Sequence, residues 1–172
     1  MADTYLVLTV IGDDRPGLVG ELSAAIAAHQ GNWLESSMSH LSGKFAGIVK
    51  VAVPVAQAGA LQAALGSLAA LKVTAESSAE KSVHAGRRLK LALVGHDRIG
   101  IVREVSQVLA KHVVNVENLE THTASAPMSA EILFHCEAEL TAAPDFNARA
   151  LKLELERLSD DLMVDISLGE TL

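Results

Sequence analysis

An aspartate–arginine pair followed by a glycine occurs twice in the chain, in GDDRPGLVGELS from Gly12 and in GHDRIGIVREVS from Gly95. Seven of the twelve positions are identical, at a constant separation of 83 residues. Arginine pairs well with carboxylates, and an aspartate oxygen can accept hydrogen bonds from an ammonium group. The motif therefore has the residue types that bind a small zwitterion, and its repetition indicates a duplicated structural unit.

The residues around each motif predict a strand before it and a helix after it. The apolar runs 4–11 and 88–94 are too short for a typical helix and end at turn residues, so both are predicted strands. Beyond each motif an apolar residue recurs every fourth position, as on the buried side of an amphipathic helix. These positions are Leu18, Leu22, Ile26, Ile101, Val105 and Leu109. Each motif is thus placed in a strand-to-helix loop.

Aspartate, arginine and proline in this loop each have a structural interpretation beside the ligand-binding one. Asp14 and Asp97 are placed to cap the helix by accepting hydrogen bonds from its first N–H groups, and Pro16 suits the first helical turn. Arg15 and Arg98 oppose the positive end of the helix dipole, so each needs an anionic partner. That partner is either a ligand carboxylate or a glutamate across an interface, and the sequence favours neither.

The glycines of the motif have two different expected roles. Gly12 and Gly95 are expected to allow a sharp turn, because glycine accepts a positive φ at little cost. Gly17 and Gly100 remove a β-carbon from the start of the helix, so a ligand or another backbone can come close. The free N–H groups and dipole of a helix N-terminus attract carboxylates there.

The rest of each half predicts a hairpin, a second helix and a last strand. Turns are expected around residues 42–43 and 125–127, each between two extended segments. Leucines at helical spacing then predict helices around 61–68 and 151–158, where the separation of the two copies has grown to 90 residues. We place this insertion of seven residues around 139–146.

Each half is therefore predicted to be strand, helix, strand, strand, helix, strand. The expected fold class is α+β, with two tandem ferredoxin-like units whose antiparallel sheets have both helices packed on one face. We expect domains at residues 1–80 and 87–172, joined by a polar linker at 81–86. Because roughly 80 residues is small for a stable domain, the sheets are expected to pack together or to dimerise.

Composition and charge limit the classes of protein and partner. The 172 residues are 49% hydrophobic and 20% charged, as in globular proteins, and the net charge of −7 disfavours binding to a nucleic-acid backbone. Cys136 is the only cysteine, which fits a reducing compartment. Neither a signal peptide nor an apolar stretch of about 20 residues occurs. A cytoplasmic protein without membrane contact is expected.

The segment GDDRPGLVGELSAAIAAHQGNWLES resembles the beginning of an ACT domain, a family of small-molecule-sensing modules marked by D-R-P-G-L followed by a helix. The second copy, GHDRIGIVREVSQVLAKHVVNVENL, is similar but departs at two positions. Ile99 stands where proline is usual, and Val114 stands where a glycine usually precedes the residue equivalent to Asn115. The resemblance covers nearly the whole chain, as in free-standing tandem ACT proteins.

This resemblance implies a regulatory protein that is not an enzyme, needs no cofactor or metal, and senses a small amino acid, glycine or serine by family analogy. It implies a homodimer that acts through a regulatory or DNA-binding protein, without direct nucleic-acid contact, on genes of amino-acid or one-carbon metabolism. By matching position, it assigns ligand binding to Asp14, Arg15, Pro16, Gly17, Leu18 and Asn32 in the first copy, and to Asp97, Arg98, Gly100, Ile101 and Asn115 in the second. The first copy departs less from the family pattern and is the expected site.

Other classes of protein stay open or are disfavoured. ACT domains also precede catalytic domains in enzymes such as formyltetrahydrofolate deformylase, so a regulatory fragment or subunit of an enzyme is one alternative. A dimerisation module without a ligand is another. RNA-recognition modules share the predicted element order but need aromatic residues for base stacking. Only Tyr5, Phe45 and Phe134 are available on the relevant strands, and no basic surround accompanies them.

Two histidines and the cysteine have the chemistry of metal ligands, but their expected positions disfavour a metal site. A hairpin turn at 125–127 would place His122 opposite about residue 130, far along the strand from His135 and Cys136. No further ligand follows at a spacing typical of zinc sites. The sequence therefore predicts solvent-facing or packed histidines.

Overall fold

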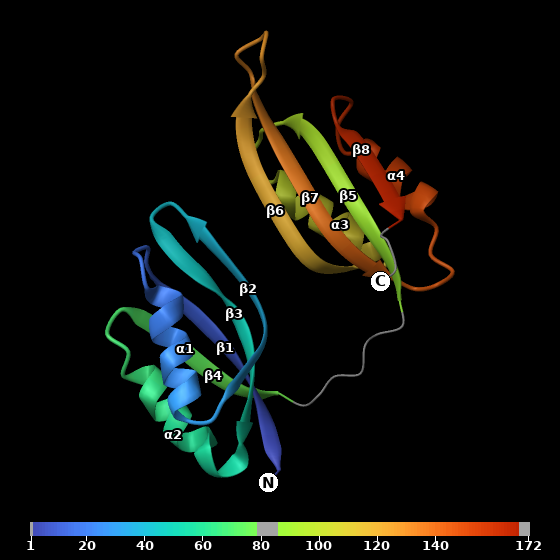
Figure 1. Cartoon of the computed structure of the whole chain (residues 1–172). Coiled ribbons are helices and arrows are strands. Elements are labelled where there is room, and N and C mark those ends of the chain that lie inside the picture. Colours follow the sequence, from blue (N-terminus) through green and yellow to red (C-terminus); the bar gives the residue numbers. More distant parts are fainter. Residues whose placement is uncertain (1, 79–85, 169–172) are drawn as a thin grey trace. The chain divides into compact units, whose positions relative to one another are not determined.

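The computed structural model describes residues 2–78 and 86–168, and the chain divides into two compact units, Met1–Ser82 and Val83–Leu172 (Figure 1). Each unit has its own cluster of buried apolar residues. The linker expected at 81–86 lies, except for residue 86, outside the described residues. The exact limits of the two domains therefore stay a prediction.

The first unit contains four strands and two helices. They are β1 (Asp3–Asp13), α1 (Leu18–Ala28), β2 (Asn32–Leu41), β3 (Lys44–Pro54), α2 (Val55–Gly66) and β4 (Leu71–Ser78). All strand pairs are antiparallel, in the order β2-β3-β1-β4. Figure 1 shows α1 and α2 against the same face of this sheet. This is the ferredoxin-like arrangement that the element order predicted.

The second unit repeats the first. Its elements are β5 (Arg87–His96), α3 (Ile101–Lys111), β6 (Asn115–Ser125), β7 (Ile132–Ala142), α4 (Ala148–Glu156) and β8 (Met163–Leu168). The antiparallel sheet has the corresponding order, β6-β7-β5-β8. The predicted fold class, α+β with two tandem βαββαβ units, is confirmed.

Alternate residues of the central strands face the helices and build the two cores. Leu8 of β1 and Leu91 of β5, for example, are 0% and 2% exposed. The predicted apolar stripe of the first helix in each unit is buried: Leu18, Leu22, Ile26, Ile101, Val105 and Leu109. In the described part of the chain no helix has both the length and the apolar character that crossing a membrane requires.

The extra residues of the second unit lie earlier than predicted. Val49 pairs with Leu8 in the first sheet, and Ala138 pairs with Leu91 in the second. Equivalent positions in the third strands are therefore already 89 residues apart. Most of the insertion precedes β7, so its predicted place around 139–146 is wrong.

The insertion lies in the turn of the second hairpin. Ser42 and Gly43 alone connect β2 to β3, both with positive φ (49° and 77°), as in the two-residue turns that match the twist of a hairpin. Residues 126–131 connect β6 to β7. The turn predicted at 125–127 is at the correct hairpin but too short, because an exposed turn accepts added residues that the sequence pattern does not reveal.

Opposite its helices, the second sheet has a face that we call the open face. It is formed by Lys90, Ala92 and Val94 of β5 and by their cross-strand neighbours on the other three strands. The residues between them, such as Leu91 and Leu93, are buried on the helix side. The register therefore arranges the side chains of the open face in rows across the sheet.

Candidate functional site

The two motif loops have the same backbone shape. Gly17 and Gly100 are the N-cap residues of α1 and α3, with φ of 96° and 92°. These values lie in the left-handed region that favours glycine. The helices begin at the next residues, Leu18 and Ile101. The shared conformation explains why both copies of the motif have glycine here.

A lack of space does not explain these two glycines. A β-carbon built on Gly17 would have Arg15 Nη1, 4.0 Å away, as its nearest neighbour, and one on Gly100 would have nothing within 4 Å. The positive φ alone disfavours other residues. A valine at either position would therefore strain the loop whether or not a ligand binds, and it is unsuitable as a test of binding.

The aspartates do not cap the helices, so that prediction is wrong. Within residues 2–78 and 86–168, no side chain caps the N-terminus of α1 or α3. Asp14 and Asp97 precede the N-cap residues by three positions, and their backbone N–H groups donate to the carbonyls of Gly43 and Ile132, at 2.9 Å in both cases. Pro16 lies before the helix and not in its first turn. The aspartate backbone thus fastens each loop to the neighbouring hairpin.

The first glycine of each motif lies in a closely packed strand and not in a turn. Gly12 and Gly95 lie within β1 and β5 and have no positive φ, so the predicted turn is wrong. A β-carbon on Gly12 would lie 2.4 Å from the carbonyl oxygen of Ala70. One on Gly95 would lie 2.6 Å from Cδ1 of Leu162. In the first unit the backbone before the last strand thus approaches the glycine too closely for a side chain, whereas in the second unit the close atom is the end of a leucine side chain.

Each motif arginine pairs with the glutamate of the same motif. Arg15 Nη2 donates to Glu21 Oε1 at 2.5 Å. Arg98 donates from Nη1 and Nη2 to the two carboxylate oxygens of Glu104, at 3.0 and 2.5 Å. The hydrogen bonds from Arg98 lower the pKa of Glu104. Within each unit the anionic partner of the arginine is therefore the glutamate six residues later, and the repeated glutamate was the signal for it.

The carboxylate of Asp14 is the acidic group of the first loop that is open to a ligand. Its side chain is 44% exposed, with Oδ2 lying 3.5 Å from His40 Nε2. The neighbouring Asp13 forms an ion pair with Lys44, and the hydrogen bond from that ammonium lowers the pKa of Asp13. The first loop therefore combines a helix N-terminus without a side-chain cap and an accessible carboxylate.

In the second copy His96 occupies the position of Asp13, and its ring connects three segments. Nε2 lies 2.9 Å from Glu131 Oε2, and Nδ1 lies 2.9 Å from Asp161 Oδ2. Hydrogen bonds to Glu131 and then to Asp161 raise the pKa of His96. The Ser159 hydroxyl and the backbone N–H of His96 hold the pKa of Asp161 well below its usual value. Protonated His96 thus fastens the hairpin turn and the turn before β8 to the second loop.

We expect His96→Ala to destabilise the second unit in a pH-dependent way. Because the folded-state pKa of His96 is raised, its stabilising contribution is complete below about pH 6.5, the unfolded value, and disappears as the pH rises through the folded value. Urea unfolding followed by circular dichroism should therefore show the larger loss of stability in His96→Ala at about pH 6 and the smaller loss at about pH 9. An equal loss at both values would contradict this role of the His96 charge.

The predicted asparagines lie away from the motif loops. Asn32 begins β2 and pairs with Ala52, which pairs on its other side with Tyr5, near the start of β1. The loop follows the end of β1, so the length of α1, about 16 Å for 11 residues, separates it from Asn32. Asn115 begins β6 in the same way and donates to Glu117 Oε1 at 2.5 Å. Within one unit the structure does not bring these residues together with the loop.

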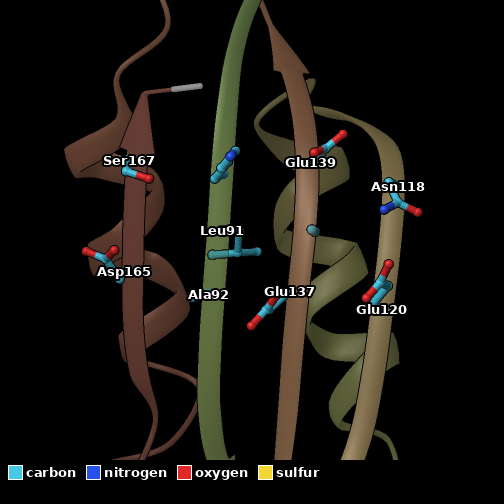
Figure 2. A pocket seen from close by; sticks show the side chains of 10 residues that line it. Leu91, Ala92, Asn118, Glu120, Glu137, Glu139, Asp165 and Ser167 are labelled. Atoms are coloured by element: carbon cyan, nitrogen blue, oxygen red, sulfur yellow. The ribbon is translucent and has the colours of Figure 1, made fainter. Parts of the chain in front are cut away.

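A shallow pocket of about 350 Å³ lies on the open face of the second sheet (Figure 2). Four carboxylates from three strands line it: Glu120, Glu137, Glu139 and Asp165. Lys90 is the cation among its lining residues, and the small side chain of Ala92 lies in the middle of one row. Sequence reasoning missed this acidic surface, because its residues come together only through the strand register.

His122 and His135 are directly opposite each other, so the predicted separation of the two is wrong. They pair in register between β6 and β7, with ring centroids 4.7 Å apart and ring planes at 2°. Cys136 is buried on the helix side, and this burial raises the pKa of its thiol. Among the residues that the structure describes, no group of three or more His, Cys, Asp or Glu could hold a metal ion.

The duplicated βαββαβ unit, with a glycine-capped helix after its first strand, defines a tandem ACT-like fold. Residues 4–76, nearly the whole of the first unit, match the family model described as ACT domain. The second unit repeats its topology and its loop geometry. No curated protein gives a significant match to the chain.

Two solved structures share the fold over almost the whole chain. An unknown protein from Galdieria sulphuraria has 28% sequence identity and a TM-score of 0.86, with 98% of this chain and 100% of that chain covered. A protein described as a "putative glycine cleavage system transcriptional repressor" has 16% identity and a TM-score of 0.71, with 99% and 100% covered. The resemblance to tandem ACT proteins is thereby confirmed.

Proposed function

We propose that this protein is a non-catalytic, cytoplasmic regulator that binds a small amino acid at the first motif loop and acts by contact with another protein. The observation that carries the proposal is the ACT-domain match over residues 4–76, because ACT domains are regulatory, ligand-sensing modules. This segment contains the helix N-terminus without a side-chain cap and the accessible carboxylate of Asp14.

The geometry of the first loop supports a division of roles in binding. The first N–H groups of α1 would take the ligand carboxylate, and Asp14 would accept hydrogen bonds from its ammonium group. Arg15 is neutralised by Glu21 and holds the loop in shape, while Leu18 is 3% exposed and belongs to the core. Asn32 would contribute only in a site formed between two copies of the chain.

The test is calorimetric titration with the amino acids, starting with glycine and serine, against wild type, Asp14→Asn and Asp97→Asn. Each substitution removes a charge at an equivalent position of one copy without changing its volume. For such small ligands we expect micromolar to millimolar affinity. Asp14→Asn should weaken binding about tenfold or more, the usual effect of losing a charged hydrogen bond, and Asp97→Asn should not.

Two other results would change the assignment. A loss in Asp97→Asn alone would make the second loop the working site. Failure of every amino acid to bind wild type would mean that the motif is a folding and dimerisation element, whose internal arginine–glutamate pairs hold the loop in shape.

Regulation of transcription is the downstream role that we propose, on genes of amino-acid or one-carbon metabolism. The fold shared with the protein described as a repressor supports it. With a net charge of −7 and an acidic open face, the chain is unsuited to bind nucleic acid directly, so the effect would pass through a regulatory or DNA-binding protein. A homodimer is part of this proposal.

A further inference from the structure

The two histidines of the open face are placed as a pair of ligands. His122 and His135 are direct cross-strand partners, and their side chains lie on the same face of the sheet. Such partners have β-carbons about 4.5–5.5 Å apart. Two imidazole nitrogens that bind one ion with bonds of about 2.0–2.1 Å lie within about 4 Å of each other. Rings with centroids 4.7 Å apart reach this arrangement by side-chain rotation.

Both rings have their nitrogens available. Within the part of the chain that the structure describes, neither His122 nor His135 has a hydrogen bond or an ion pair, and their contact is the stack with each other. The ring of His96 on the neighbouring strand differs, because carboxylates occupy both its nitrogens. His122 is exposed and His135 is half-buried, so an ion reaches the pair from solvent.

The surroundings of the pair favour a cation. The next row of the open face consists of Asp165, Ala92, Glu137 and Glu120, in the order of the strands. Glu120 and Glu137 are direct cross-strand partners, and like charges in that position destabilise a sheet. A positive charge one row away offsets this repulsion, so the carboxylates assist through charge without acting as ligands.

We propose that His122 and His135 bind a divalent transition-metal ion of the kind that imidazole prefers, such as Zn²⁺, Ni²⁺ or Cu²⁺, with water in the other coordination positions. Imidazole suits these ions, whereas Mg²⁺ and Ca²⁺ prefer oxygen ligands. The site is independent of the amino-acid site proposed above, and failure of either proposal leaves the other intact.

The first unit lacks this site and supplies its own control. The positions equivalent to the two histidines are Ser39 and Ala46, which are likewise direct cross-strand partners. Serine and alanine thus fit this place in the fold without an imidazole. The double variant His122→Ser/His135→Ala makes the second sheet like the first at these positions.

The experiment is calorimetric titration of the full chain with Zn²⁺ alone in a buffer that does not bind metal. We expect one ion per chain in wild type and in His96→Ala, and none in the double variant. Each single variant, His122→Ser or His135→Ala, should lose about tenfold or more in affinity, which corresponds to about 1.4 kcal/mol. Absence of Zn²⁺ binding to wild type, or wild-type affinity in the double variant, overturns the proposal.

Two measurements on the unaltered protein keep the test decisive even where a variant fails to fold. Cu²⁺ should bind more tightly than Zn²⁺, and Mg²⁺ in about 100-fold excess should not displace Zn²⁺. Displacement by Mg²⁺ would assign the ion to the carboxylate row and refute the imidazole site.

Discussion

Leu22→Ala is expected to lower the free energy of unfolding of the first unit by about 3–5 kcal/mol, the usual range for removing a fully buried leucine. Leu22 is 0% exposed and belongs to the apolar cluster that α1, α2 and the first sheet share. The loss combines the transfer of the removed methyl groups with the cavity that the surrounding leucines and valines cannot close.

The measurement uses the single tryptophan of the chain. Trp33 packs against the first core, so its fluorescence during urea unfolding follows the first unit. Val19→Ala is the matched control, because Val19 lies on the same helix but is 48% exposed, and its replacement should change stability by less than about 1 kcal/mol. Equal effects of the two substitutions would contradict the position of α1 in the core.

Gly12→Ala is expected to destabilise the first unit by about 1–3 kcal/mol, the typical range for inserting an atom into a packed interior. The new β-carbon would lie 2.4 Å from the Ala70 carbonyl oxygen and 2.9 Å from Leu71 Cδ2. The backbone cannot move away freely, since Gly12 and Leu71 are paired between β1 and β4. Trp33 fluorescence again reports the transition.

The control for this glycine is Gly20→Ala. Gly20 lies within α1, and a β-carbon there would have nothing within 4 Å. Alanine should raise stability by about 0.5–1 kcal/mol, because it is the better helix former. Stability changes of opposite sign in Gly12→Ala and Gly20→Ala would separate the effect of close packing from the general cost of glycine to stability. A neutral Gly12→Ala would contradict the close approach of the Ala70 carbonyl oxygen to this glycine.

The order and type of the elements could be predicted from the sequence because burial follows local periodicity. The four-residue stripe through Leu22 and the alternation around Leu8 depend only on which face of a helix or strand meets the core. The register beyond the second hairpin could not be predicted, since it depends on the length of the turn at 126–131. That single unknown moved His122 from its predicted position to one opposite His135.

The loop was located correctly, but its contacts were not. Whether an aspartate or a glycine forms the N-cap depends on the path of the chain into the helix, which residue preferences leave undecided. The contact between Arg15 and Glu21, by contrast, could have been predicted, because Glu21 is part of the same repeated motif. Asn32 was assigned to the site by resemblance alone, and the strand order places it at the other end of α1.

The six-residue turn between β6 and β7 bears on how the two halves of a duplicated gene can diverge. Each doubling of loop length costs only about 0.6 kcal/mol in closure entropy, so the longer turn leaves the core of its unit almost unaffected. Yet Glu131, within this turn, reaches His96 beside the second motif loop. An insertion there alters the surroundings of the second motif loop, so the two halves can come to differ at their loops while both keep the same fold.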